Sequence, residues 1–277
     1  MRKLFALALL MAMITACQPG AVPATDGDAL ETAVSATLSA MEAPSAPDGQ
    51  GGSATATVSP EPATPAPEPA FADWLLAYSS GVDLWVRVDS QPATQIAAGG
   101  VILTLVASSD GRTIVYARSD QNGENYQLRA VASDGTGDRL LLDQIALDAL
   151  HPLGNALHIR PAQIDFLAGT HTVLFNTRGV FEGPGLAKYD DLQAIDTDSG
   201  VLTQLLPPDM GGDFYVAPDA ERMALVTPSS IGLADVDGSN RQPDIVTFDP
   251  VITYSEYAYY PSPSWAPDSS RFGVIKM

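Results

Sequence analysis

A turn phrase that returns along the chain constrains the fold more than any other feature of the sequence. It reads "ASSDGRTIVYARS" at residues 107–119, "VAPDAERMALVTP" at 216–228 and "WAPDSSRFGVIKM" at 265–277, with a weaker copy, "FLAGTHTVLFNTR", at 166–178. In each copy, Asp, Gly or Ser residues that favour a tight turn separate two short apolar segments. Each copy is therefore predicted to be a β-hairpin.

A second kind of hairpin is predicted between these copies. "YQLRAVASDGTGDRLLLD" (126–143), "DLQAIDTDSGVLTQLL" (191–206) and "IGLADVDGSNRQPDIV" (231–246) each join two apolar segments through an Asp-Gly or Ser-Gly turn. "DLWVRVDSQPATQIA" (83–97) is the first and most degenerate member of this set. Because the two kinds alternate, the chain is predicted to form pairs of hairpins.

The spacing of the hairpins predicts a four-stranded repeat. Asp219 and Asp268 lie about 50 residues apart, and Asp110 and Asp219 lie about twice as far apart. Two hairpins per period give four strands, the repeat unit of a β-propeller blade, and no helical periodicity persists, so we predict an all-β fold. The predicted units are a partial blade near 74–98, blades near 101–145, 160–206 and 211–249, and a final hairpin from Trp265.

The final hairpin has no second hairpin after it. The propeller is therefore expected to be incomplete at its C-terminus and to form an open arc with an unpaired strand at Phe272–Ile275. Such an apolar edge invites pairing with another chain. The alternative is a ring of four blades, in which the first partial unit and the final hairpin complete one another.

A family resemblance rests on the same turns. The Pro-Asp-(Gly/Ser)-x-x-(Ile/Phe) turn and the Asp-Gly-Ser-Asn turn at 237–240 resemble the WD-repeat-like repeats of TolB-like propellers, over roughly residues 72–277. The resemblance implies a bacterial β-propeller lipoprotein and, since such propellers have more blades, a truncated chain. It is specific for the blade and weak for function, because propellers serve many purposes.

The first residues are typical of an exported protein. Arg2 and Lys3 precede an apolar segment, Leu4–Ile14, that has the length of a signal peptide. The run Ile14-Thr15-Ala16-Cys17 resembles a bacterial lipobox, which implies lipidation of Cys17. We expect residues 1–17 to be a lipoprotein signal peptide, and the alternative is a plain secretory signal. The protein is then lipid-anchored to the cell membrane or outer membrane and faces the periplasm or exterior.

A tether is predicted between the anchor and the propeller. Residues 18–70 consist mainly of Ala, Pro, Thr, Ser and Gly, and "SPEPATPAPEPA" at 59–70 favours extended conformations. Such a composition buries too little apolar surface to offset the entropy of ordering, so this linker is predicted to be disordered. Large apolar residues begin at Phe71, and the propeller domain is predicted over 71–277.

The charge and the single cysteine exclude several classes of function. The chain has a net charge of −19 from 14 Lys and Arg against 33 Asp and Glu. This charge disfavours nucleic acids and anionic lipid headgroups as partners. Cys17 is the only cysteine, so the domain has no disulfide and no thiolate metal site.

No motif in the sequence indicates catalysis. The chain lacks a Gly-x-Ser-x-Gly nucleophile elbow. The histidines, His151, His158 and His171, lack the spacing of a zinc site, and we expect them to be ordinary surface or loop residues. "DTDSG" (196–200) and "DVDGSN" (235–240) have calcium-like Asp spacing, but the hairpin-turn interpretation is favoured. We expect no catalytic residues, no metal and no cofactor.

The most unusual stretch is rich in tyrosine. "ITYSEYAYYPSPSW" occupies residues 252–265. Aromatic loops can form recognition surfaces, but packing between adjacent blades is the favoured interpretation. The candidate recognition surface consists of Tyr254, Tyr257, Tyr259, Tyr260 and Trp265.

Two functions remain open from the sequence. The first is a membrane-tethered, non-catalytic propeller that binds or scaffolds another envelope protein. The second is an accessory propeller of a larger serine peptidase-type hydrolase, whose catalytic domain is absent from this chain. The missing nucleophile elbow favours the first.

Overall fold

The computed structural model describes residues 74–277 with the exception of 184–187, 254–256 and 276–277. Backbone contacts divide the chain into two units, Met1–Ala66 and Pro67–Met277, and the described residues belong to the second. The predicted signal peptide, Cys17, the linker and Phe71 lie outside the described residues. Among the described residues, no helix is long and apolar enough to cross a membrane.

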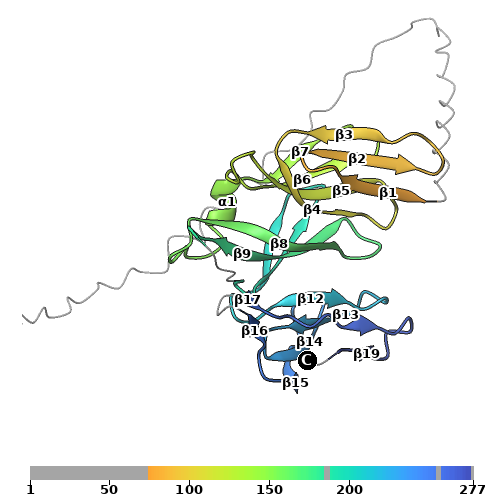
Figure 1. Ribbon diagram of the computed structural model, residues 1–277. Helices are drawn as coiled ribbons and strands as arrows, with labels where there is room; N and C mark the ends of the chain where they lie inside the picture. Colours follow the sequence, from red (N-terminus) through yellow and green to blue (C-terminus); the bar gives the residue numbers. More distant parts are fainter. Residues whose placement is uncertain (1–73, 184–187, 254–256, 276–277) are drawn as a thin grey trace, which may run out of the picture. The chain divides into compact units, whose positions relative to one another are not determined.

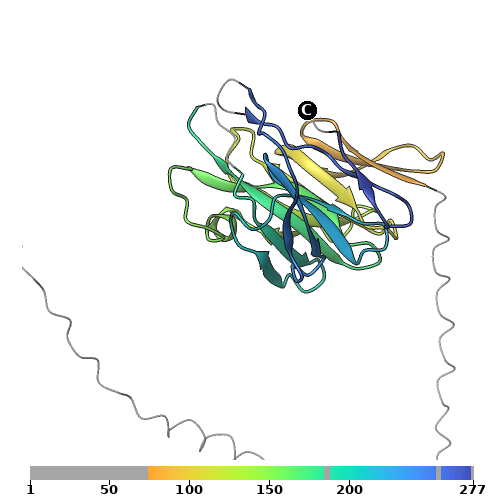
Figure 2. The same ribbon diagram turned by 90° about the horizontal axis from the view of Figure 1, so that it is seen from below.

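The described residues form antiparallel sheets whose strands follow one another in sequence order (Figures 1 and 2). The first sheet has three strands: β1 (Leu75–Ser79), β2 (Asp83–Val88) and β3 (Thr94–Ala98). The second sheet has four strands: β4 (Val101–Ala107), β5 (Thr113–Ser119), β6 (Gln127–Ala132) and β7 (Arg139–Leu142). The third sheet also has four: β8 (His158–Phe166), β9 (Thr172–Val180), β10 (Leu192–Asp196) and β11 (Leu202–Leu206).

The rest of the chain adds one more four-stranded sheet and two short hairpins. The fourth sheet consists of β12 (Asp213–Val216), β13 (Arg222–Val226), β14 (Ser230–Asp235) and β15 (Gln242–Thr247). The hairpins are β16 (Ile252–Thr253) with β17 (Tyr257–Ala258), and β18 (Ser264–Trp265) with β19 (Phe272–Gly273). The β18–β19 pair is called the terminal hairpin below. The all-β prediction of four-stranded propeller blades is confirmed, with unit boundaries close to those predicted.

The repeated turn phrase has a repeated hydrogen-bond pattern. In the second sheet, the backbone N–H of Ser108 donates to the carbonyl oxygen of Thr113 (2.8 Å). The backbone N–H of Gly111 donates to the carbonyl oxygen of Ser108 (2.9 Å). Ala217 and Ala266 begin turns with the same two hydrogen bonds. The fourth turn residue has a positive φ of 68° at Gly111, 57° at Ala220 and 58° at Ser269. This shared backbone geometry explains why the phrase predicts a hairpin wherever it occurs.

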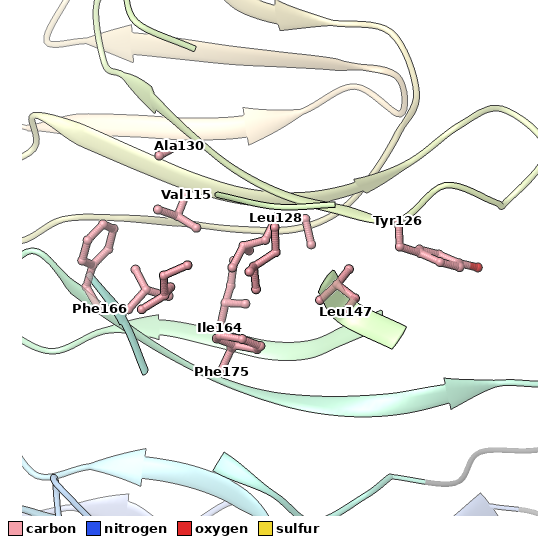
Figure 3. Close-up of a cluster of buried hydrophobic side chains, with 12 residues drawn as sticks. Val115, Tyr126, Leu128, Ala130, Leu147, Ile164, Phe166 and Phe175 are labelled. Carbon is pink, nitrogen blue, oxygen red and sulfur yellow. The ribbon is translucent and has the colours of Figure 1, made fainter. Parts of the chain in front are cut away.

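The largest buried cluster lies between the second and third sheets (Figure 3). Val115 and Leu128 point from the second sheet toward Ile164 and Phe175 of the third, and all four are at least nine-tenths buried. Fully burying side chains of this size contributes about 1.5–3 kcal/mol each. Similar clusters join the first sheet to the second, the third to the fourth, and the fourth to the terminal hairpin.

The first strands of successive sheets lie next to one another. β1 contacts β4, and β4 contacts β8. The Gln163 side chain joins β8 to β12, because its Nε2 donates to the Phe214 carbonyl (2.6 Å) while its Oε1 accepts from the Phe214 amide (3.1 Å). The Trp265 indole N–H donates to the Tyr215 carbonyl (2.8 Å) and so joins the terminal hairpin to β12. This stacking of sheets through their first strands is the arrangement of propeller blades.

Two details differ from the sequence analysis. A helix of five residues, α1 (Gln144–Asp148), follows β7, and the Asp143 side chain caps it by accepting from the Ala146 amide. The third sheet begins with β8 at His158, slightly before the predicted start of that unit near residue 160. The predicted edge at Phe272–Ile275 is paired on one side, where Phe272 faces Trp265, and Ile275 is 80% exposed.

Candidate binding site

The tyrosine-rich segment contributes to both packing and surface. Tyr254 lies outside the described residues, and the backbone of Tyr257 pairs with Thr253 in β16–β17. Tyr260 and Trp265 are partly buried against the fourth sheet, and the Trp265 ring meets Phe272 edge-on at 5.1 Å between centroids. Tyr259 is 36% exposed. Packing thus explains Tyr260 and Trp265, whereas Tyr259 is available to a partner.

Tyr260 contacts a group of charged residues between the third and fourth sheets. Its hydroxyl donates to Oδ1 of Asp190 (3.1 Å), and Nζ of Lys188 lies 3.8 Å from the centroid of its ring. The same ammonium donates to both carboxylate oxygens of Asp213, at 2.6 and 2.7 Å. Burial raises the pKa of Asp190 to about 6, although Tyr260 and Lys188 act in the opposite direction. The pKa of Asp190 is thus raised well above the ordinary range of an aspartate, toward the weakly acidic range.

A polar pocket of about 370 Å³ opens beside this group. Strands β8, β9 and β12 and the segment that follows β9 supply its walls. The polar and aromatic side chains that line the pocket are Arg160, Gln163, Arg178, Lys188, Asp213 and Tyr215.

The walls of this pocket are held by side-chain hydrogen bonds to backbone groups. Gln163 fixes the separation of β8 and β12 through Phe214, as described above. Asn176 on β9 is 1% exposed; its Oδ1 accepts from the Gln163 amide (2.8 Å), and its Nδ2 donates to the Gly212 carbonyl (2.9 Å). Nδ2 of Asn176 also lies 3.1 Å from Oδ1 of Asp213. Asp213, the ion-pair partner of Lys188, is thus held in position by the protein itself.

The three histidines are each paired with an aspartate. His158 contacts Asp148 (3.0 Å) and the exposed His171 contacts Asp198 (2.5 Å). His151 lies in the loop before β8, as one of the two expected settings, but it is buried there, with 6% exposure. No metal-binding group of three His, Cys, Asp or Glu residues occurs in the part of the chain that the structure describes.

The buried pair of His151 and Asp191 is structural. Nε2 of His151 lies 2.8 Å from Oδ2 of Asp191. Burial alone would raise the pKa of Asp191, but hydrogen bonds from His151, Gln193 and the Thr177 amide outweigh it and hold that pKa below its usual value. This network joins the strand β9 to β10 and to the segment before β8, and it leaves the carboxylate no free face for a substrate.

The two calcium-like segments are hairpin turns, as favoured from the sequence. Oδ1 of Asp196 accepts from the amides of Asp198 (3.2 Å) and Ser199 (2.7 Å). Oδ1 of Asp237 accepts from the Ser239 amide (2.8 Å), and Oδ2 of Asp235 accepts from Nδ2 of Asn240 (2.6 Å). These carboxylates satisfy the backbone and side chains of their own turns.

The pocket was not recognisable from the sequence. Its basic residues are far apart in the sequence, and only the strand register brings them together. The signal in the sequence is weak: basic residues are scarce in this acidic chain, but nothing in their spacing shows that they meet.

The fold is similar to that of several solved propellers. No protein family model matches the chain, and no curated protein does. A TolB from Acinetobacter baumannii matches with 12% identity and a TM-score of 0.46, over 76% of this chain and 48% of that one. The β-propeller domain of a trilobed protease from Pyrococcus furiosus matches with 9% identity and a TM-score of 0.41, over 70% and 61%. Dipeptidyl peptidase 4 from Porphyromonas gingivalis matches with 10% identity and a TM-score of 0.46, over 73% and 37%.

The chain thus spans less than two thirds of each of these three structures. Their names include both peptidases and a protein without a stated activity, and the identities are low. At identities of 9–12% and TM-scores below 0.5, these likenesses assign no function to this chain.

Proposed function

We propose that this chain is a non-catalytic β-propeller that binds a ligand or protein of the cell envelope and is tethered there through lipid on Cys17. The observation that carries the proposal is the pre-positioned polar pocket between β8, β9 and β12. Its walls are fixed by Gln163 and Asn176, which is what a binding site on a rigid scaffold requires. The Cys17 anchor is supported by the resemblance of its segment to a lipobox.

The absence of catalysis is supported by the histidine contacts. Within the described ranges, each histidine ring is held by an aspartate, and no serine or threonine hydroxyl donates to a histidine. A nucleophilic hydrolase needs that contact to activate its hydroxyl. We therefore expect no labelling of the purified full chain by a fluorophosphonate probe that modifies active serines, and labelling would refute the non-catalytic assignment.

The tether is tested by fractionation of cells that express the full chain. Cys17→Ala is expected to move the protein from the membrane fraction to the soluble fraction or to block its processing. Ala16→Gly is the matched control, because it keeps a small residue before the cysteine. Unchanged processing and membrane retention of the Cys17→Ala variant would contradict the anchor.

Partner binding is tested by photo-crosslinking in intact cells. A photoreactive amino acid at Tyr259 is expected to give a discrete adduct with an envelope protein. The control position is Leu140, which is 47% exposed on β7, away from the tyrosine-rich segment in sequence. Equal crosslinking from both positions, or none from Tyr259, would refute a recognition surface at that residue.

A further inference from the structure

Three basic residues at the pocket lie in one row across the third sheet. Arg160 on β8 is directly opposite Arg178 on β9, and Arg178 pairs in turn with Lys188 on the following segment. Side chains at directly opposite positions project from the same face of a sheet, and like charges there repel one another. The chain has only 14 basic residues against 33 acidic ones. Three of the 14 lie at adjacent positions, so a negative group beside them offsets their mutual repulsion.

The fold supplies that negative group at one end of the row. Lys188 is paired with Asp213, and both are at least three-quarters buried (21% and 14% side-chain exposure). At the other end, no carboxylate of the described residues forms an ion pair with Arg160. Its guanidinium donates to the Pro161 carbonyl (3.3 Å) and lies 6.0 Å from the centre of the Tyr126 ring.

The setting of Arg160 strengthens its attraction for an anion. Burial lowers the pKa of Arg160, because desolvation disfavours the charged form. Arginine nevertheless stays protonated in proteins, so the pocket has a positive charge that water solvates incompletely. A charge in this setting gains more from an anionic partner than an exposed one does.

We propose that the row of Arg160, Arg178 and Lys188 binds a small multivalent oxyanion, whose clustered phosphate or carboxylate oxygens bridge the three side chains. The volume of about 370 Å³ suits a compact ligand. The net charge of −19 repels extended polyanions such as nucleic acids, so local attraction selects small ones. This inference rests on the proposed function and names the ligand class of the same pocket.

The test is calorimetric titration of the full chain in low salt with two probes, pyrophosphate and citrate, which separate a phosphate source from a carboxylate source. At least one probe is expected to bind, and acetate to bind at least tenfold more weakly. Arg160→Gln is expected to weaken binding at least tenfold. The matched control, Arg87→Gln, removes an exposed arginine on β2 whose guanidinium lies 5.6 Å from the centre of the Trp74 ring, and it is expected to leave binding unchanged.

The unfolding midpoint of each variant without ligand shows whether it is folded. If Arg160→Gln fails to fold, Arg160→Lys is used: it keeps the charge but loses the two-pronged donor, and it is expected to bind at least threefold more weakly. Absence of binding by both probes, or equal binding by wild type and the Arg160 variant, would overturn the proposal. Either result leaves the Cys17 and crosslinking tests intact, so failure of this inference is distinguishable from failure of the proposed function.

Discussion

Replacing Asp190 with asparagine is expected to make the protein more stable at neutral pH and to remove part of its pH dependence. The folded protein holds the pKa of Asp190 at about 6, against an ordinary value of 3.8, mainly because the carboxyl is buried. Between these values the folded state binds more protons than the unfolded state. The contribution of this group to stability is therefore present at low pH and is lost as the pH rises from about 4 to about 6.

The magnitude follows from the size of the shift. A difference of roughly two pKa units corresponds to about 3 kcal/mol at full ionisation, since each unit is about 1.4 kcal/mol. Part of that difference already exists at pH 4.5, where an unfolded aspartate is mostly ionised. The change between pH 4.5 and pH 7.5 is then about 2 kcal/mol, and residual solvent contact makes this an upper value.

Asparagine suits this position in other respects. Asp190 has a φ of 47°, in the left-handed region, which asparagine tolerates about as well as aspartate. The amide oxygen can still accept from the Tyr260 hydroxyl. Asp244→Asn is the matched control, because Asp244 has a similar φ of 56° but lies exposed on β15.

The assay is urea unfolding of the wild type and both variants at several values of pH from 4.5 to 7.5. The free energy of unfolding of Asp190→Asn, minus that of the wild type, is expected to rise by about 2 kcal/mol across this range. The same difference for Asp244→Asn is expected to stay flat. A flat difference for Asp190→Asn would show that burial does not raise the pKa of this carboxyl to about 6.

Three further perturbations test other parts of the fold. Phe175→Ala removes a fully buried ring between the second and third sheets, so urea unfolding is expected to show a loss of about 3–5 kcal/mol, and a loss below 1 kcal/mol would contradict the core. Gly212→Ala places a side chain against the Val226 carbonyl at a φ of 142°, so the thermal midpoint is expected to fall by several degrees, and no change would contradict this close approach. Limited proteolysis is expected to cut within residues 18–70 first, and equal protection of that region and the sheets would show that the linker prediction is wrong.

The sheets were predictable because their turns are local. Each hairpin depends on a few Asp, Gly and Ser residues whose backbone preferences are intrinsic, as the shared positive φ at Gly111 and Ser269 illustrates. The strand order then follows from the alternation of two hairpin types. Even the short terminal hairpin forms where the phrase at Trp265 predicts it.

The pocket was not predictable, because it depends on register. The pairing of β8 with β9 shifts between Pro161 and Ile164, and only this irregularity brings Arg160 opposite Arg178. A shift of one residue would place the two arginines on opposite faces. Lys188 reaches the row through an isolated bridge outside any strand. The burial of His151 likewise depends on Asp191, which is 40 residues away in the sequence.

The side-chain link between Gln163 and Phe214 has a mechanical consequence. Within each sheet, a continuous ladder of backbone hydrogen bonds resists shear, but at this point the third and fourth sheets are joined by the side-chain amide of Gln163, which makes two hydrogen bonds to Phe214. These side-chain hydrogen bonds can break and reform without disturbing the backbone hydrogen bonds of either sheet. While the Gln163 contact is intact it fixes the separation of β8 and β12, and this line is the first place at which the pocket wall can open. Opening of the pocket would be registered first as faster hydrogen exchange at the amide of Phe214, before any strand loses protection.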